Sequence, residues 1–328
     1  MRSDPPRGHL HASTPQLSLL RSARTGFLHQ GVREGVPMRA ATGTFGALVL
    51  TLALAAPLSS SARAEESIRL IIAAQPGQTS ELTARTEVGV LVFAGGDPMT
   101  YQVRNEGTLS SRAERVAADG TVTWKTRIAR MSYERDGRTL MQFDAEDEEA
   151  SGNAAALKEL EVHSEQQSDG RIRDFRVEGS ESEIRNKVEA GLEESIQNSV
   201  LMYPKDPVAT GQSWNVGKRT MPFPGVGRLE YQLVATLLGV PRKNGAARAD
   251  IRLDAADVRF VPDADSRMRG KMSSFRLQGD AQYDIDGRFL RSQDTYGFLS
   301  LALPNPEGGT MTMQIYMRVG MEEKRGKE

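Results

Sequence analysis

The chain has 328 residues, with 42 Lys and Arg, 43 Asp and Glu, four His and no Cys. This length allows one large domain or two smaller ones. Without cysteine the chain can form no disulfide, thiolate zinc site, iron–sulfur site or cysteine nucleophile, and its near-zero net charge argues against a general nucleic-acid binder.

The first 37 residues differ from the rest of the chain. They hold three of the four histidines, a Pro5-Pro6 pair and scattered arginines, and they show no hydrophobic periodicity. We interpret residues 1–37 as a disordered extension or as the product of a misassigned start codon, with Met38 as the initiator.

Residues 38–64 have the composition of a secretory signal peptide. Arg39 supplies a positive charge, residues 45–56 are mostly apolar, and Ala62-Arg63-Ala64 is a small-x-small cleavage site. The apolar run is shorter than the ~20 residues that a membrane-spanning helix needs. We therefore expect cleavage after Ala64, no integral membrane anchor, and export to the periplasm, the cell envelope or the extracellular space.

Apolar and polar residues alternate along much of residues 65–328, which is typical of strands with one buried face. The stretches that show this, or look extended, are 68–73, 82–93, 101–116, 121–133, 229–237, 249–253, 275–285 and 311–321. Between Ile128 and Met131 the apolar residues change parity, which predicts a β-bulge near Ala129–Arg130.

Four Asp-Gly pairs and one Asn-Gly pair punctuate these stretches. They begin at Asp119, Asp136, Asp169, Asp286 and Asn244. Such pairs tolerate positive φ and close tight hairpins, so consecutive strands are expected to form an antiparallel sheet.

Two segments break the strand pattern. Residues 153–160 predict a short helix. Residues 181–202 predict a long amphipathic helix, because Ser180 and Glu183 form a capping box and apolar residues recur every four positions. These are Ile184, Val188, Leu192, Ile196 and Val200. The simpler role for this apolar stripe is packing on the sheet, and the alternative is a lid over an apolar groove.

Residues 203–215 follow the predicted helix. Pro204 and Pro207 prevent its continuation, Gly211 permits a turn, and Trp214 begins the next strand. We interpret Pro207, Gly211 and Trp214 as structural anchors.

The run Pro207-Val208-x-x-Gly211-x-Ser213-Trp214 resembles a motif of a widespread family of exported bacterial proteins of unknown function. The hairpins at 116–123 and 170–179 are similar to hairpins of that family. Phe143-Asp144 matches the start of its Phe-Asp-Ser run, although Ala145 replaces the serine. The resemblance covers nearly all of 65–328, on short motifs.

That family in turn resembles the half-barrels of periplasmic lipoprotein carriers. In these a curved antiparallel sheet wraps around one or more helices and leaves an apolar cavity. The resemblance implies a fold and not a function, and it carries over no ligand-contact residue.

Few catalytic chemistries fit the residues after the leader. His163 is the single histidine there, and no Gly-x-Ser-x-Gly elbow accompanies it, so neither a Ser-His-Asp triad nor a typical catalytic zinc site is indicated. We interpret His163 as a surface strand residue. The acidic run 144–149 offers ligands of the kind that Ca²⁺ prefers, but its spacing fits no ion-binding loop, and a solvated loop is the simpler interpretation. We expect no catalytic residue, metal or cofactor.

Four methionines share one face of the last predicted strand. They are Met311, Met313, Met317 and Met321. Methionine suits adaptable apolar binding surfaces as well as irregular cores. Core packing is the simpler interpretation. The alternative is that these methionines bind a ligand together with the apolar stripe of the predicted helix at Ile184, Val188, Leu192 and Ile196.

The sequence therefore predicts a mainly β (α+β) fold for 65–328, with a large curved antiparallel sheet of about ten strands, or half-barrel, packed around one long amphipathic helix. Two halves, 65–203 and 204–328, are a further expectation. The preferred function is a non-catalytic exported protein that binds a lipid or acyl chain in a groove between sheet and helix, without nucleic acid. One alternative is a structural or interaction module with a cell-envelope protein partner. A hydrolase with paired carboxylates is the weakest, since nothing singles out a pair.

Overall fold

The computed structural model describes residues 67–147, 153–179, 185, 186, 189, 201–223, 226–243, 245–263, 270–305 and 308–326. All of them belong to one compact unit, residues 61–328. Every helix and strand formed by these residues lies within that unit.

Strands dominate the described residues. In chain order the elements are β1 (Thr79–Phe93), β2 (Met99–Val116), β3 (Val122–Arg135), β4 (Arg138–Asp144), α1 (Asn153–Lys158), β5 (Glu161–Gln166), β6 (Ile172–Glu178), β7 (Ser213–Phe223), β8 (Gly227–Gly239), β9 (Arg242–Lys243), β10 (Ala246–Pro262), β11 (Lys271–Asp284), β12 (Phe289–Pro304) and β13 (Thr310–Arg325).

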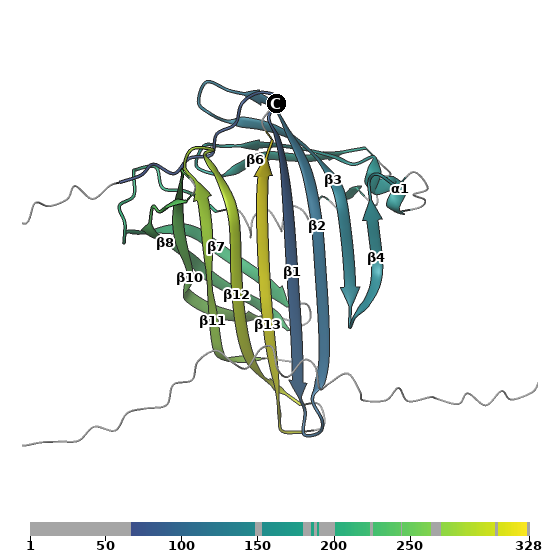
Figure 1. Cartoon of the computed structure of the whole chain (residues 1–328). Coiled ribbons are helices and arrows are strands. Elements are labelled where there is room, and N and C mark those ends of the chain that lie inside the picture. Colours follow the sequence, from purple (N-terminus) through teal and green to yellow (C-terminus); the bar gives the residue numbers. More distant parts are fainter. Residues whose placement is uncertain are drawn as a thin grey trace, which may run out of the picture. The chain divides into compact units, whose positions relative to one another are not determined.

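In the described part of the chain, all strands join one sheet of 13, in which every pairing is antiparallel. The order is β6-β5-β3-β2-β1-β13-β12-β11-β10-β8-β7, with β4 beside β3 and β9 beside β10. The chain builds one set of neighbouring strands from β1 to β6 and a second set from β7 to β12. Strand β13 then pairs with β1 and β12 and joins the two sets (Figure 1). The prediction of a mainly β fold with one large antiparallel sheet is confirmed.

The local turn chemistry follows the sequence closely. At Asp136-Gly137 both residues have positive φ, 49° and 75°, which is the geometry of a tight type I′ hairpin, and this turn joins β3 to β4. The bulge is also where the sequence predicts it. Thr108 pairs with Arg130 and Leu109 with Ile128, so that Ala129 has no partner residue in β2. Its carbonyl instead accepts a hydrogen bond from the Ala145 N–H at 2.8 Å.

The structure describes the short predicted helix but little of the long one. Helix α1 forms within the expected 153–160 segment. Of the long helix predicted over 181–202, only Arg185, Asn186 and Glu189 are described as helical, while Leu201 and Met202 are not helical. Ile184, Val188, Leu192 and Ile196 lie outside the described residues, and the expected packing of the sheet around this helix stays a prediction.

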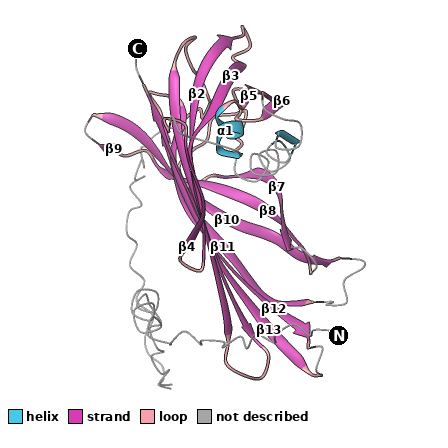
Figure 2. Cartoon of the chain, turned by 90° about the vertical axis from the view of Figure 1, so that its right-hand side faces the viewer, coloured by secondary structure: helices cyan, strands magenta, loops and turns pink. Residues whose placement is uncertain are grey.

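The sheet curls on itself and buries its main core on the inner face. In Figure 1, β8 and β10 run behind β11, β12 and β13, and the side view in Figure 2 shows β7 and β8 diverging from β12 and β13. The largest apolar cluster accordingly combines Leu229 and Leu233 of β8 with Leu299 of β12 and Ile315 of β13. A smaller cluster lies around Phe143, Leu160 and other residues of β3–β6 and α1.

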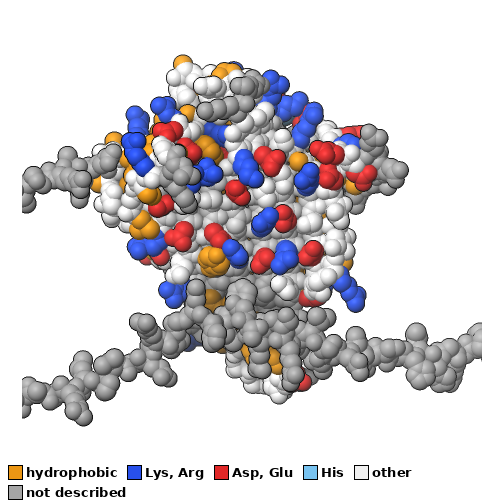
Figure 3. All heavy atoms as spheres, in the orientation of Figure 1, with side chains coloured by type: hydrophobic (Ala, Val, Ile, Leu, Met, Phe, Trp, Pro, Cys, Tyr) orange, Lys and Arg blue, Asp and Glu red, His pale blue; other side chains and the backbone are white. Residues whose placement is uncertain are grey.

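The outer face of the same sheet is polar. Arg104 of β2 lies 3.0 Å from Glu87 of β1 and 3.9 Å from Glu134 of β3, and Arg318 of β13 lies 2.7 Å from Asp294 of β12. Figure 3 shows Lys or Arg and Asp or Glu side chains interspersed over this face. Exposed pairs of this kind contribute little to stability. They identify the convex side of the sheet as the side that faces water.

Gly279 provides a test of how closely β11 and β12 approach. A Cβ at this position would clash with the Asp294 carbonyl oxygen, so Gly279→Ala must displace β12. We expect the free energy of unfolding to fall by about 1–3 kcal/mol, measured by urea denaturation. Gly89→Ala is the matched control, because a Cβ there meets nothing within 4 Å. An equal loss in both variants would contradict the close approach.

Candidate ligand-binding site

Two neighbouring cavities lie on the inner side of the sheet, between the first strand set and β12 and β13. Each has a volume of about 170 Å³, and they share the lining residues Leu82, Gln166, Ile172 and Glu323. We call the first the Tyr203 cavity and the second the Trp124 cavity, after one residue that lines each. Together they form the groove, and their combined volume reaches the lower end of the ~300–1,000 Å³ typical of small-molecule sites.

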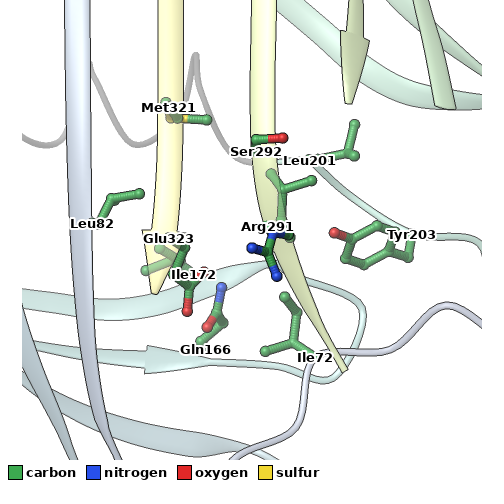
Figure 4. A pocket seen from close by; sticks show the side chains of 11 residues that line it. Ile72, Leu82, Gln166, Ile172, Leu201, Tyr203, Arg291, Ser292, Met321 and Glu323 are labelled. Atoms are coloured by element: carbon green, nitrogen blue, oxygen red, sulfur yellow. The ribbon is translucent and has the colours of Figure 1, made fainter. Parts of the chain in front are cut away.

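The curl of the sheet creates the Tyr203 cavity. Its lining includes Ile172 of β6 and Leu290 of β12, although β5, β3, β2, β1 and β13 separate these two strands in the sheet. The segments outside the strands close it with Ile72, Leu201 and Tyr203 (Figure 4). A flat sheet could not bring these residues together, so the cavity is a product of the long-range pairing.

The Trp124 cavity is apolar at its walls, and most of its polar groups bond to one another. Its apolar lining comprises Leu82, Leu109, Trp124, Val162, Ile172 and Phe175. The Ser111 and Thr126 hydroxyls are 2.8 Å apart, and the Trp124 indole N–H donates to Gln166 Oε1 at 3.1 Å. These hydrogen bonds within the protein leave the apolar walls to contact a ligand, and the cavity suits a hydrocarbon.

A buried ion pair lies where the two cavities adjoin, because Glu323 lines both of them. Arg325 Nε lies 2.7 Å from Glu323 Oε1, and the two side chains are 5% and 17% exposed. The Arg325 guanidinium also donates to the Ala73 carbonyl and lies over the rings of Phe289, at 4.6 Å, and Trp124, at 5.5 Å. Its contacts thus link β13, β12, β3 and the segment before β1.

Two neighbours of Glu323 bind one of its carboxylate oxygens, Oε1. Besides Arg325, it accepts a hydrogen bond from the Ser80 hydroxyl at 2.9 Å. The negative charge that this residue brings to both cavities is therefore balanced inside the protein.

Tyr203 differs from the other polar groups of the groove. Its ring is 5% exposed and packs edge-on against Tyr283 at 5.3 Å. Its hydroxyl is buried and has no hydrogen-bond partner among the described residues, whereas the Tyr283 hydroxyl donates to the Ile71 carbonyl and accepts from the Ile71 N–H at 3.1 Å. Burial raises the pKa of Tyr203 well above its usual value, so the phenol stays neutral and keeps its O–H donor.

Arg291 reaches the same cavity through a second bulge. Gln282 pairs with Ser292 and Tyr283 with Leu290, so that Arg291 has no partner residue in β11. Leu290 and Arg291 both line the cavity, which the alternating side chains of a regular strand would not allow. The guanidinium is 42% exposed, and its one ion pair with a described residue is with Asp284, at 4.0 Å.

The four methionines of β13 do not converge on the groove. Met321 lines the Tyr203 cavity. Met317 belongs to the main core, and Met311 and Met313 pack against that core. The other predicted ligand contacts, on the segment 184–196, lie outside the described residues.

The anchors predicted around Trp214 have distinct positions. Trp214 lies in the main core, and its indole N–H donates to the Met202 carbonyl at 3.0 Å. Gly211 has a φ of +85° and donates its N–H to the Leu237 carbonyl at 2.7 Å, while Pro207 is exposed. The Trp214 hydrogen bond thus holds Met202, the residue directly before Tyr203.

His163 is less exposed than the sequence indicates. Its side chain is 15% exposed and lies 3.5 Å from Glu178 of β6 and 3.8 Å from Glu114 of β2. Among the described residues no group of three or more His, Asp or Glu has the arrangement of a metal site.

Tyr203, Arg291 and Arg325 are not among the residues that the sequence pattern indicates. For Arg291 a signal exists, since the adjacent apolar residues Phe289 and Leu290 interrupt the alternation of the strand. Tyr203 and Arg325 carry no such signal, because their burial depends on strands far away in the sequence.

The chain has little similarity to known proteins. No family model and no curated protein matches the chain. One similar solved structure, described as lipid–protein interactions in lipovitellin, has 11% sequence identity and a TM-score of 0.44. The match covers 77% of this chain and 26% of that one, so this chain spans about a quarter of its length. Among the described residues, no helix is long and apolar enough to cross a membrane.

Replacing Arg325 tests the contribution of the buried ion pair beside the groove. We expect Arg325→Gln to lower the free energy of unfolding by about 3–5 kcal/mol, because it leaves the buried Glu323 without its partner. Chemical denaturation measures this loss. The control is Arg85→Gln, which breaks the exposed pair between Arg85 and Glu106, 3.1 Å apart. It is expected to lower the free energy of unfolding by less than about 1 kcal/mol. A similar loss of unfolding free energy in both variants would show that the Arg325 pair is no more stabilising than an exposed one.

Proposed function

We propose that this chain is an exported, non-catalytic protein of the periplasm or cell envelope that holds a lipid or acyl chain in the groove. The observation that carries the proposal is the pair of adjoining cavities, whose walls are mainly apolar and whose polar groups in the Trp124 cavity largely satisfy one another. The signal-peptide pattern of residues 38–64 supports the cellular location.

The distribution of polarity over the sheet supports the same function. Ion pairs cover the outer face of β1, β2, β12 and β13, whereas the inner face carries the apolar core and the groove. A protein that holds an apolar molecule in water needs this arrangement. Moving the ligand out of water lowers the free energy only on the side of the sheet that is shielded from water.

The alternative, an interaction module that pairs through an open strand edge, has less support. The main run of strands ends at β6 and β7, and β4 beside it pairs with β3 alone. Strand β6 is short, carries Arg173 and Arg176, and is distorted at Asp174, where φ is +41°. Strand β7 contains Pro222. Charge, distortion and proline are features that prevent edge-to-edge pairing.

Filling the groove is the direct test of this function. Leu82 of β1 lines both cavities, so Leu82→Trp is expected to weaken binding of the neutral fluorescent probe 1-aminoanthracene at least tenfold, or about 1.4 kcal/mol. Titration of the probe into the purified chain, followed by fluorescence, measures the affinity.

Thr83→Trp is the matched control. Thr83 is the next residue of the same strand and points to the opposite face of the sheet, so its replacement is expected to leave probe binding unchanged. Native mass spectrometry of the chain purified from its own source gives an independent measurement. The function fails if the unmodified chain binds no probe and releases no lipid on organic extraction.

A further inference from the structure

The two cavities of the groove differ in which polar groups remain without partners. In the Trp124 cavity, Ser111, Thr126, Ser80 and Gln166 all take part in hydrogen bonds within the protein. In the Tyr203 cavity, the Tyr203 hydroxyl is buried without a partner among the described residues. A buried polar group without a hydrogen bond costs about 1–3 kcal/mol, so this hydroxyl is a feature that needs an explanation.

Arg291 adds a positive charge to the cavity that Tyr203 lines. Both residues line the Tyr203 cavity, and Figure 4 shows the Tyr203 hydroxyl pointing toward Arg291. The bulge at Arg291 brings a charged side chain to this face of β12. Among the described residues the guanidinium has one carboxylate partner, Asp284, at 4.0 Å. Most of the five N–H donors of the guanidinium are therefore available to another acceptor.

The remaining charges near the cavity favour a negative ligand over a positive one. Glu323 also lines both cavities, but its charge is balanced by Arg325, 2.7 Å from its Oε1, and the Ser80 hydroxyl donates to the same oxygen at 2.9 Å. The cavity thus presents one compensated carboxylate, one loosely paired guanidinium and one unpaired O–H donor.

On these observations we propose that the groove binds a single-chain amphiphile with a carboxylate head. The carboxylate accepts hydrogen bonds from the Arg291 guanidinium and the Tyr203 hydroxyl. The hydrocarbon tail passes Leu82 and Ile172 into the Trp124 cavity. This inference rests on the proposed function and specifies the class and the direction of its ligand.

Competition among ligands that differ only in their heads tests the inference. Laurate, 1-dodecanol and dodecylamine share one chain length and are each titrated against bound 1-aminoanthracene. We expect laurate to displace the probe at a concentration at least tenfold lower than 1-dodecanol, with dodecylamine the weakest, because an anion gains charge-assisted hydrogen bonds from Arg291.

Three variants identify the groups that recognise the head. Arg291→Gln is expected to reduce the preference for laurate over 1-dodecanol to about twofold or less. Tyr203→Phe is expected to reduce it severalfold and to leave the melting temperature unchanged or higher, because it removes an unpaired buried hydroxyl and keeps the ring. Arg276→Gln removes an exposed arginine of β11 that bonds to Gln278, and it is expected to leave the preference unchanged.

The direction of the ligand has its own readout. The chain contains two tryptophans, and Trp124 lines the cavity assigned to the tail. In the Trp214→Phe variant, 12-bromododecanoate is expected to quench the fluorescence of Trp124 more strongly than 2-bromododecanoate. If that variant does not fold, the difference between the unmodified chain and Trp124→Phe gives the same comparison.

The outcomes separate the two proposals. If none of the three ligands displaces the probe and the chain binds no probe at all, the proposed function fails. If laurate and 1-dodecanol compete equally and Arg291→Gln changes nothing, the groove binds apolar chains but the carboxylate head is wrong. Preference for dodecylamine would assign the head to Glu323 and overturn the inference, as would stronger quenching by 2-bromododecanoate.

Discussion

The buried pair of Glu323 and Arg325 is the constraint on which the groove depends. Both residues belong to β13, but the guanidinium also contacts the rings of Trp124 and Phe289 and the Ala73 carbonyl. One charged side chain therefore links β13 to its neighbour β12 and to β3, which lies three strands away in the sheet. Burying a guanidinium is costly unless its hydrogen bonds are satisfied, and the curved sheet is the arrangement in which carboxylate, carbonyl and aromatic rings surround it together.

The same constraint separates two chemical environments that lie side by side. On one side of Glu323, hydroxyl and amide groups bond to each other and leave apolar walls. On the other side, the neutral phenol of Tyr203 and the guanidinium of Arg291 face a common space. This asymmetry gives the groove a direction. Neither cavity alone would distinguish the two ends of a bound chain, because the distinction arises only where they meet.

Local features of this fold could be predicted from the sequence, and long-range features could not. Alternating residues located β8, β10, β11 and β13, and the change of parity after Ile128 located the bulge at Ala129, because both depend on neighbours within one or two strands. The curl depends on which strands finally meet, and no periodicity encodes that. For the same reason the sequence directed attention to Met311, Met313 and Met317, which pack in or against the core, and passed over Tyr203 and Arg291.

The position of β13 determines when this sheet can be completed. The last strand in chain order lies in its middle, where Ser80 pairs with Arg325, while each flanking set of strands is assembled from neighbours in sequence. Non-local pairing of this kind forms slowly, because the chain must first lose the entropy of a long loop. A polypeptide that emerges N-terminus first would therefore carry two incomplete half-sheets, with apolar inner faces and open edges at β1 and β12, until its final strand arrives. Protection from aggregation during that interval is a requirement that this topology places on the cell that makes it.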